Sequence, residues 1–479
     1  MRIVSYAFLL ILSNLFRFSL QFTCTQISDR DETSGSVLNI PNNSSTPVPI
    51  PSNFNCTYTI KPPKLVFAQI TVTNVLSGAN DVIIVSDGQQ KTSEIRKNSP
   101  NKMIFYVFPQ TTTTVNVQNF DDSSKFQMTI DFISLPKPEQ RTLQKGQNLN
   151  YVTLSSIQKK PLSLSSDGPI TLTLALSSYL SDVFDNYFLI DGDMDNPKSI
   201  KRLVDFQLSN FNTSSNIVSI VGLDEAVSHS TLILNPSSQL NGFSKFRGFT
   251  VDETNRKIEV KAENGEKIGV MIVSNNIQQL VLNRIELGEE NNCKSVAITG
   301  PPTSDSMTLI DFKSDDYSLP QLFPYPYFSI IVENCDAQFN ITNSISSDYY
   351  NIESDRSGFI FSPIYFNSEA TNGYMNITFT YNGEERRRFS VDVDRVTFGS
   401  INSELDINIY DSDWKKTLST VITGNQEGTR SRALGSYLNV QMYGSTAARL
   451  HWSLSSYSSS FFNLPFIIML SALMIMISN

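Results

Sequence analysis

Short runs of alternating apolar and polar residues extend over nearly the whole chain, and they restrict the fold more than any other feature. Clear examples are residues 68–73, 170–174, 257–261 and 389–393. A period of two in short, turn-bounded runs is typical of half-buried β-strands. Asn-Gly and Asp-Gly pairs, which favour hairpin turns, separate these runs. No segment outside the termini has a long helical period, so we predict an all-β fold made of sandwich domains.

The N-terminus has the pattern of a secretory signal peptide. Met1 and Arg2 precede an apolar stretch over residues 3–16, which matches a charged region followed by a hydrophobic one. A cut beyond Cys24 would leave an odd number of cysteines in an oxidising compartment. We therefore predict a signal peptide over residues 1–23.

The C-terminus carries an apolar run over residues 464–477, with no basic residue after it. It is shorter than the roughly 20 residues that a transmembrane helix needs, and it has no positive cytoplasmic flank. A glycosylphosphatidylinositol (GPI) anchor signal over residues 456–479 fits better. A short membrane tail and an ordinary buried segment are the alternatives. The attachment candidates are Ser453, Ser455, Ser456 and Ser458. We therefore expect a lipid-anchored protein that passes through the secretory pathway to the outer leaflet of the plasma membrane.

Composition narrows the class of partner. Charged residues make up 17% of the chain and the net charge is −9, which argues against nucleic acid and against anionic membrane surfaces. Asn-x-Ser/Thr sequons are expected to be glycosylated on this route. They lie at Asn42, Asn43, Asn55, Asn212, Asn340 and Asn376.

The four cysteines are Cys24, Cys56, Cys293 and Cys335. We expect disulfide bonds from Cys24 to Cys56 and from Cys293 to Cys335, although four cysteines allow three connectivities.

One phrase occurs twice: an Asp, five mostly strand-like residues, then Asp-Gly. It runs from Asp81 to Gly88 and from Asp185 to Gly192. With the segment 51–60 upstream, it resembles CUB domains, and more closely the CUB-like secreted and cell-surface proteins of nematodes. The resemblance implies jelly-roll β-sandwich domains over residues 24–136, 141–252 and, more weakly, 350–455, where segments 358–365, 405–411 and 437–442 carry it. Residues 256–345 are expected to form an intermediate β region.

Some CUB domains bind calcium, and the resemblance places Asp81 with Asp122, and Asp185 with Asp224, at ligand positions. The upstream Glu of that pattern is missing. Two carboxylates are few for an ion that takes six to eight oxygen ligands. We therefore expect these aspartates to hold turns, and we predict no cofactor, with calcium as the alternative.

Catalytic sets are missing from the sequence. The two histidines, His229 and His451, lie far apart, and there is no His-Glu-x-x-His or Gly-x-Ser-x-Gly motif. We predict that the protein is not an enzyme and that its exposed loops, such as the acidic segment 192–197, bind a protein or a glycan. The two Asp-Gly turns are expected to point outward. The resemblance to the nematode group implies a role in epithelial innate defence or stress response, which is an expectation by analogy. The alternative is a structural surface-coat glycoprotein with no specific ligand.

Overall fold

We describe the chain from a computed structural model. It describes residues 35–456 except 42–43, 90, 122, 145, 147, 179–182, 225–227, 253–254, 275–278, 291, 354, 368–372 and 384–386. The predicted signal peptide and anchor signal, with Cys24, Asn42, Asn43, Asp122 and Ser458, therefore lie outside the described residues. No helix in the described part of the chain is long and apolar enough to cross a membrane.

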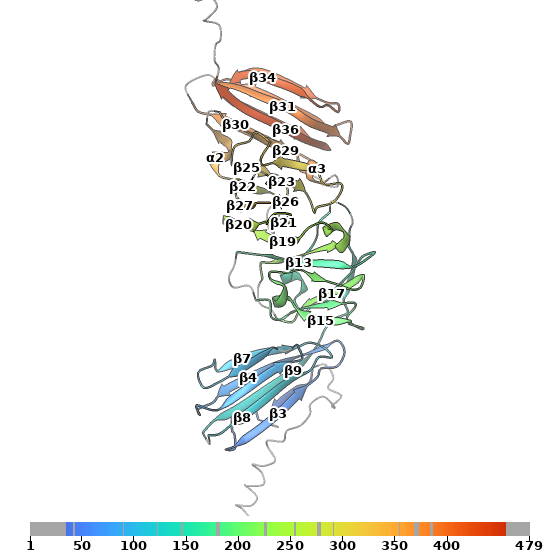
Figure 1. The fold of residues 1–479 in the computed structure, drawn as a ribbon, viewed down its shortest axis with the longest axis vertical. Helices are drawn as coiled ribbons and strands as arrows, with labels where there is room; N and C mark the ends of the chain where they lie inside the picture. The colour runs from blue at the N-terminus through green and yellow to red at the C-terminus, as the bar shows by residue number, and fades with distance from the viewer. Residues whose placement is uncertain are drawn as a thin grey trace, which may run out of the picture. The chain divides into compact units, whose positions relative to one another are not determined.

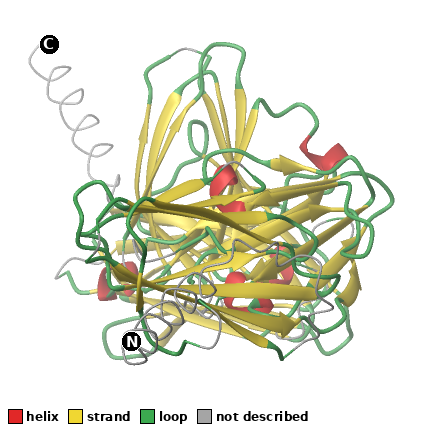
Figure 2. Ribbon diagram, turned by 90° about the horizontal axis from the view of Figure 1, so that it is seen from below, coloured by secondary structure: helices red, strands yellow, loops and turns green. Residues whose placement is uncertain are grey.

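The described residues are nearly all β, which confirms the predicted fold class (Figure 2). Two compact units can be separated. The first comprises residues 1–143, 152–172 and 181–238, and the second comprises residues 144–151, 173–180 and 239–479. The strands group into four successive sandwiches, which Figure 1 shows from blue to red along the chain.

The first sandwich contains β1 to β9. One sheet has the order β1-β9-β4-β7, with β2 also paired to β9, and the other has the order β3-β8-β5-β6. The signature strand β5 lies between β8 and β6, and Val82, Ile83 and Val85 are buried. The bounds are β1 (Val37–Ile40), β2 (Val48–Pro49), β3 (Phe54–Ile60), β4 (Val66–Val75), β5 (Val82–Asp87), β6 (Thr92–Ile95), β7 (Lys102–Val107), β8 (Thr113–Asn119) and β9 (Lys125–Ser134).

The second sandwich contains β10 to β18. Its first sheet has the order β10-β12-β17-β14-β15, and β11, β18, β13 and β16 form the opposite layer. The bounds are β10 (Glu139–Thr142), β11 (Asn150–Thr153), β12 (Leu162–Ser165), β13 (Ile170–Leu176), β14 (Tyr187–Asp191), β15 (Ser199–Arg202), β16 (Phe211–Asn212), β17 (Ile217–Gly222) and β18 (Thr231–Pro236). Short 3-10 turns are η2 (Leu154–Ile157), η3 (Leu203–Phe206) and η4 (Ser237–Leu240).

The third sandwich contains β19 to β27, in the segment that the sequence had marked only as an intermediate β region. One sheet has the order β19-β21-β26-β23-β24, in which β19 also pairs in parallel with Ala175 and Leu176 of β13, and the other has the order β20-β27-β22-β25. The bounds are β19 (Lys245–Val251), β20 (Arg256–Lys261), β21 (Lys267–Ser274), β22 (Leu280–Leu287), β23 (Lys294–Thr299), β24 (Thr308–Asp311), β25 (Gln321–Phe323), β26 (Tyr327–Glu333) and β27 (Asp336–Thr342). Its core is extensive but also contains Phe359, Phe361, Tyr365 and Phe366 of the next sandwich, so this region is a complete sandwich that shares part of its core.

The fourth sandwich contains β28 to β36, with sheets β28-β30-β35-β32-β33 and β29-β36-β31-β34. The three segments quoted for the resemblance become β29, β32 and β35. The bounds are α2 (Ser347–Tyr350), β28 (Asn351–Ile352), β29 (Ser357–Phe361), α3 (Pro363–Phe366), β30 (Met375–Tyr381), β31 (Arg387–Phe398), β32 (Glu404–Tyr410), β33 (Lys416–Ile422), β34 (Thr429–Gly435), β35 (Tyr437–Tyr443) and β36 (Thr446–Ser456). Ser362 begins α3 by accepting the N–H of Tyr365, and Pro363 follows it, which is a favourable helix start.

All four sandwiches repeat one strand order. The sheets β3-β8-β5-β6, β12-β17-β14-β15, β21-β26-β23-β24 and β30-β35-β32-β33 correspond strand for strand. In the second, third and fourth sandwiches an extra strand, β10, β19 or β28, pairs in parallel with the first strand of that sheet. The chain is therefore a fourfold tandem repeat at the level of topology.

The third and fourth sandwiches, both in the second unit, share strand β29. Its residues are buried on both sides. Phe359 and Phe361 belong to the core of the third sandwich, and Ile360 belongs to the core of the fourth. Strand β29 is thus a wall common to two cores.

Candidate functional site

The buried aspartate of the first signature, Asp81, holds loops of its own sandwich. It is fully buried, and its Oδ2 accepts hydrogen bonds from Ser124 Oγ at 2.5 Å and from the N–H of Gly78 at 3.2 Å. Its Oδ1 accepts the N–H of Phe120 at 2.7 Å. Both carboxylate oxygens are occupied by protein donors, which is the arrangement that a buried charge requires. The expected partner at a calcium site, Asp122, lies outside the described residues.

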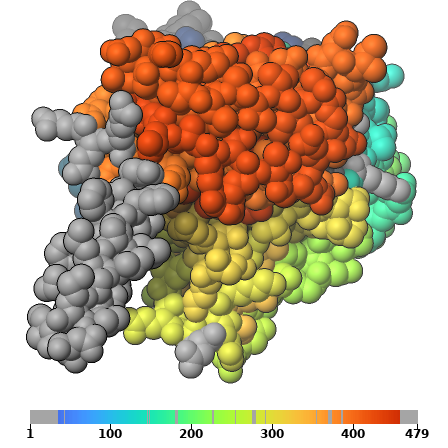
Figure 3. All heavy atoms as spheres, turned by 90° about the horizontal axis from the view of Figure 1, so that it is seen from above, coloured from blue at the N-terminus to red at the C-terminus, as the bar shows by residue number. Residues whose placement is uncertain are grey.

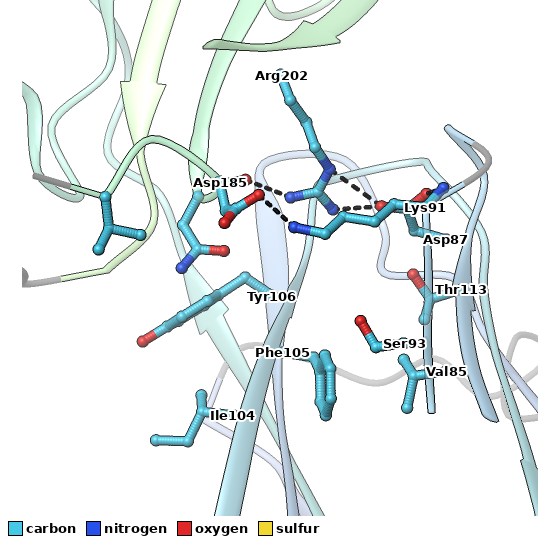
Figure 4. A pocket seen from close by; sticks show the side chains of 12 residues that line it. Val85, Asp87, Lys91, Ser93, Ile104, Phe105, Tyr106, Thr113, Asp185 and Arg202 are labelled. Carbon is cyan, nitrogen blue, oxygen red and sulfur yellow. Dashed lines mark hydrogen bonds and ion pairs between the residues drawn. The ribbon is translucent and has the colours of Figure 1, made fainter. Parts of the chain in front are cut away.

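The second aspartate of the same signature, Asp87, links two sandwiches of the first unit. Its Oδ1 accepts the N–H groups of Gln89 and Lys91, both at 2.9 Å, and so holds its own turn. Its Oδ2 accepts Arg202 Nε at 3.0 Å and Nη2 at 2.5 Å (Figure 4). The two side chains are only 12% and 10% exposed. The Asp87-Gly88 turn therefore faces the second sandwich.

A second ion pair crosses the same joint. Lys91 Nζ bonds Asp185, the opening residue of the second signature, and Arg202 Nη1 donates to the carbonyl oxygen of Asp185 (Figure 4). Gln89 Nε2 also donates to the carbonyl oxygen of Ile200 at 3.4 Å. The predicted calcium partner of Asp185 does not join it: Asp224 accepts a hydrogen bond from Asn186 at 2.9 Å. No cluster of three His, Cys, Asp or Glu residues that could hold a metal occurs among the described residues.

An apolar cluster lies beside these charges and completes the joint. It contains Phe67, Phe108, Leu135, Phe188, Ile190, Met194, Val221 and Leu223. Phe108 and Phe188 come from different sandwiches, and their ring centroids are 5.0 Å apart. Arg202 also lies 4.9 Å from the Phe188 ring, an attractive cation–π distance. Together the ion pairs and this cluster form a continuous interface between the first and second sandwiches.

The acidic segment 192–197, which we predicted as a ligand-binding loop, belongs to this joint. Met194 is buried in the apolar cluster, and Asp195 forms an ion pair with Lys64 of the first sandwich at 3.1 Å. Asp193 holds the turn by accepting the N–H groups of Asp195 and Asn196, both at 2.8 Å. The loop therefore contacts a neighbouring domain of its own chain.

Asp191 shows how the second signature differs from the first. Burial acts to raise the pKa of its carboxyl, but side-chain and backbone hydrogen bonds from Ser215 and Ser214 outweigh burial and hold the pKa below its usual value. These two serines start the turn before β17. The equivalent aspartates of the two signatures thus have different roles, one within a domain and one between domains.

A hollow of about 180 Å³ opens beside the ion pairs (Figure 4). Its walls combine Asp87, Lys91, Asp185 and Arg202 with the apolar side chains of Ile104 and Val183. The four charges pair with one another, so no carboxylate in the hollow is placed as a free acid or base. The arrangement binds one domain to the next and offers a small mixed surface at its rim.

The remaining predicted site residues are dispersed over the sandwiches. Cys293 and Cys335 form the predicted disulfide bond in the third sandwich. Cys56 is buried and disulfide-bonded, while its expected partner lies outside the described residues, so that pairing stays a prediction. His451 packs on Phe359 with centroids 5.2 Å apart, as expected for a structural histidine.

The described sequons lie on strands. Asn55, Asn212 and Asn376 are exposed, whereas Asn340 is half-buried in the middle of β27. In the first and fourth sandwiches an asparagine of the adjacent strand donates to both polar residues of the sequon. Asn116 bonds Asn55 and Thr57, and Asn439 bonds Asn376 and Thr378, at 2.8–3.0 Å.

The attachment candidates among the described residues, Ser453, Ser455 and Ser456, lie at the end of β36, which ends at Ser456. Ser453 pairs with strands on both sides, opposite Ser357 and Ser390. Ser455 and Ser456 are exposed at the end of the strand.

Sequence reasoning found one half of the joint and missed the other. The Asp-Gly signature marked Asp87 and Asp185, but Arg202 and Lys91 were not singled out. Arg202 lies 115 residues from Asp87 in the sequence, and no local pattern reports a pairing over that distance.

Four-stranded and five-stranded layers, paired and repeated with one strand order, define a protein of tandem β-sandwich domains. Residues 19–136 match the family model of the CUB-like domain. This match covers the first sandwich and confirms the CUB-like resemblance there. No curated protein sequence matches the chain.

Solved structures that resemble the chain include CUB-containing proteins. The CUB1-EGF-CUB2 domain of human MASP-1/3 has 10% identity and a TM-score of 0.18, covering 65% of this chain and 100% of that one. The corresponding domains of rat MASP-1 have 11% identity and a TM-score of 0.16, covering 42% and 97%. The extracellular region of zebrafish Gpr126/Adgrg6 has 10% identity and a TM-score of 0.18, covering 66% and 52%. At such TM-scores these likenesses carry no argument, and the assignment rests on the family match and the strand order.

Proposed function

We propose that this chain is a non-catalytic binding protein of the cell surface, built of four CUB-like sandwiches. The observation that carries the proposal is the CUB-like match over residues 19–136 together with the same strand order in the three sandwiches that follow. CUB domains are extracellular binding modules. The described signature carboxylates support a binding role, because they hold turns and join domains.

The joint of the first unit supports a particular form of binding. Two ion pairs and an apolar cluster keep the first two sandwiches in one arrangement, so loops from both domains are presented together. Preorganisation of this kind lowers the entropic penalty of binding. The ligand is a protein or a glycan. The proposal is tested by applying the purified ectodomain to glycan arrays and to arrayed surface proteins. Absence of binding on both arrays would favour the structural coat.

The coat remains the second candidate because of the sequons. Asn55, Asn212 and Asn376 are exposed on three different sandwiches, so glycans there would cover much of the surface. Removal of the sequons separates the two functions. If the chain is a binding protein, the variant with Asn→Gln at the sequons should still bind its ligand. If it is a coat protein, the variant should lose the volume of its glycans, and no ligand binding should be found with or without them.

Membrane attachment is part of the proposal. We infer a lipid anchor at the outer leaflet, added after β36. Ser453 pairs with a strand on each side, whereas Ser455 and Ser456 pair with one strand only and are exposed. Ser455 and Ser456 are therefore better attachment sites than Ser453, and Ser458 stays a candidate from the sequence. Treatment of intact cells with a phosphatidylinositol-specific phospholipase should release the protein, and retention would overturn the anchor. A role in epithelial defence or stress response is proposed from the resemblance to nematode CUB-like proteins.

A further inference from the structure

Two turns at equivalent places in the repeat have the same hydrogen bonds. In the first sandwich the turn from Asp87 to Lys91 joins β5 to β6, and in the fourth the turn from Asp411 to Lys415 joins β32 to β33. In each turn the aspartate N–H donates to the lysine carbonyl oxygen at 3.0 Å. In each, the aspartate Oδ1 accepts two N–H groups, from the second residue after it and from the lysine, at 2.9–3.0 Å.

The two turns differ in what they contact. In the first sandwich Asp87 Oδ2 accepts Arg202, and Lys91 pairs with Asp185, so the turn docks onto a β-sandwich. In the fourth, neither Asp411 Oδ2 nor Lys415 Nζ has a hydrogen bond or ion pair among the described residues, and Lys415 is exposed. The chain thus contains one occupied and one open copy of the same charged turn.

The open turn also carries an exposed tryptophan. Trp414 is 57% exposed and has a φ of 59°, a left-handed conformation that a bulky residue adopts only under strain. Glycine is the usual residue where a hairpin turn of this kind needs a positive φ. The Trp414 ring stacks on the Tyr437 ring, with centroids 4.0 Å apart and an interplanar angle of 16°. Strained backbone is concentrated at functional sites, and tryptophan is among the commonest anchor residues of interfaces.

We propose that the turn over residues 411–415 is a docking site for a β-sandwich domain of another protein. The partner presents an arginine to Asp411 and an acidic side chain to Lys415, as Arg202 and Asp185 do in the first unit. A second copy of this chain does not supply that surface, because its own first sandwich covers it. The inference rests on the proposed binding function and names one site for it. Figure 3 shows the surface of the fourth sandwich in orange and red.

The test uses the full ectodomain and a peptide probe from its own sequence. A backbone-cyclised peptide copying residues 185–202 carries Asp185 and Arg202 at the two ends of the β14–β15 hairpin. Fluorescence reports binding, because Trp414 is exposed while Trp452, the other tryptophan of the sequence, is 1% exposed. We expect a saturable change that Asp411→Asn weakens at least tenfold and that added salt reduces. The peptide with Arg202→Ala should lose a similar factor.

Controls separate docking from folding. Asn at position 411 keeps an acceptor for the turn, so Asp411→Asn should not unfold it. Trp414→Gly places glycine where the backbone has a positive φ, so the turn should keep its shape. Binding of the peptide to this variant is measured by the fluorescence anisotropy of a labelled peptide, and we expect it to be at least tenfold weaker than to the wild type. A signal that does not saturate, or equal binding by the wild type and Asp411→Asn, overturns the site. Glycan binding that needs Trp414 but not Asp411 would replace the protein partner with a sugar. Ligand binding elsewhere on the ectodomain, with this turn silent, would overturn the site alone and leave the proposed function in place.

Discussion

Arg202 donates two hydrogen bonds to a single oxygen of Asp87, and this pair joins two domains of the first unit. Asp87 uses its other oxygen to hold its own turn. One carboxylate therefore defines both the shape of a loop and the surface onto which the next domain packs. The same residue type at the equivalent place in the second sandwich, Asp191, bonds only its own domain in the described contacts.

Replacing Arg202 with methionine should destabilise the first unit. Methionine keeps most of the apolar stem of Arg202, but it leaves the nearly buried Asp87 without a cation. Removing one partner of a buried ion pair typically lowers the free energy of unfolding by about 3 kcal/mol. We expect a lower free energy of unfolding in urea and faster proteolysis between the first and second sandwiches. Arg96→Met is the matched control, since its ion pair with Glu94 is half exposed and should contribute under about 1 kcal/mol. Equal effects of the two substitutions would show that the joint does not depend on the Arg202 pair.

Asp81 should prove structural and independent of calcium. Asp81→Ala removes three hydrogen bonds and leaves the Phe120 N–H without its acceptor, while Gly78 and Ser124 keep weaker partners; we expect a loss of about 3 kcal/mol. Asp81→Asn, which keeps an acceptor, should cost less. Thermal unfolding with calcium and with a chelator should coincide for the wild type. A calcium-dependent rise in Tm that Asp81→Ala abolishes would instead establish a metal site.

The disulfide between Cys293 and Cys335 should stabilise the third sandwich. The two cysteines are 42 residues apart, and closing a loop of that length contributes about 4 kcal/mol in the chain-entropy model. The Cys293→Ala, Cys335→Ala double variant should therefore unfold at lower urea concentration. Reducing agent should lower the unfolding transition of the third sandwich in the wild type toward that of the variant and leave this transition of the variant unchanged, since the remaining disulfide, at Cys56, belongs to the first sandwich. A shift of this same transition in the reduced variant would mean that the Cys293–Cys335 bond does not carry the stability.

Asp406 should make the fourth sandwich less stable as pH rises from about 4 to 6. Burial, and then the neighbouring Glu404, raise the pKa of Asp406 to about 6 in the folded chain. A carboxyl with a raised folded pKa binds its proton more tightly when folded, so its stabilising contribution is complete below the unfolded pKa and is lost through pH 6.

The measurement is Tm against pH for the wild type and Asp406→Asn. The substitution should flatten the profile between pH 4 and 6. Asp413→Asn, in an exposed turn, is the control and should leave the slope as it is. A steeper profile in Asp406→Asn would contradict the assignment.

Local pattern was enough to predict the strands and several turns. Alternation located β4, β13, β20 and β31, but its prediction of one buried face was wrong for β13, which is buried on both faces from Ile170 to Ala175. It did not reveal that residues 256–345 repeat the fold, because strand order depends on pairings between distant segments such as β20 with β27. Side-chain alternation does not encode those pairings.

The site was predictable only where a motif marked it. The Asp-Gly signature located Asp87 but did not show that its turn packs onto the next domain, because a turn that ends a hairpin is also available to a neighbouring domain. The acidic segment 192–197 looked like a free loop, since its charges suggested solvent. Met194 within it is buried, and Lys64 neutralises Asp195, contacts that no sequence window contains.

The shared strand β29 has a consequence for how the second unit comes apart. Detaching it would uncover Phe359 and Phe361 on one side and Ile360 on the other, so neither neighbour can melt while the other remains intact. Heating should therefore release the third and fourth sandwiches in a single cooperative transition. A truncation placed between them would produce two fragments with exposed apolar core residues, which should aggregate. Any gain or loss of domains at this end of the chain therefore has to involve both sandwiches together.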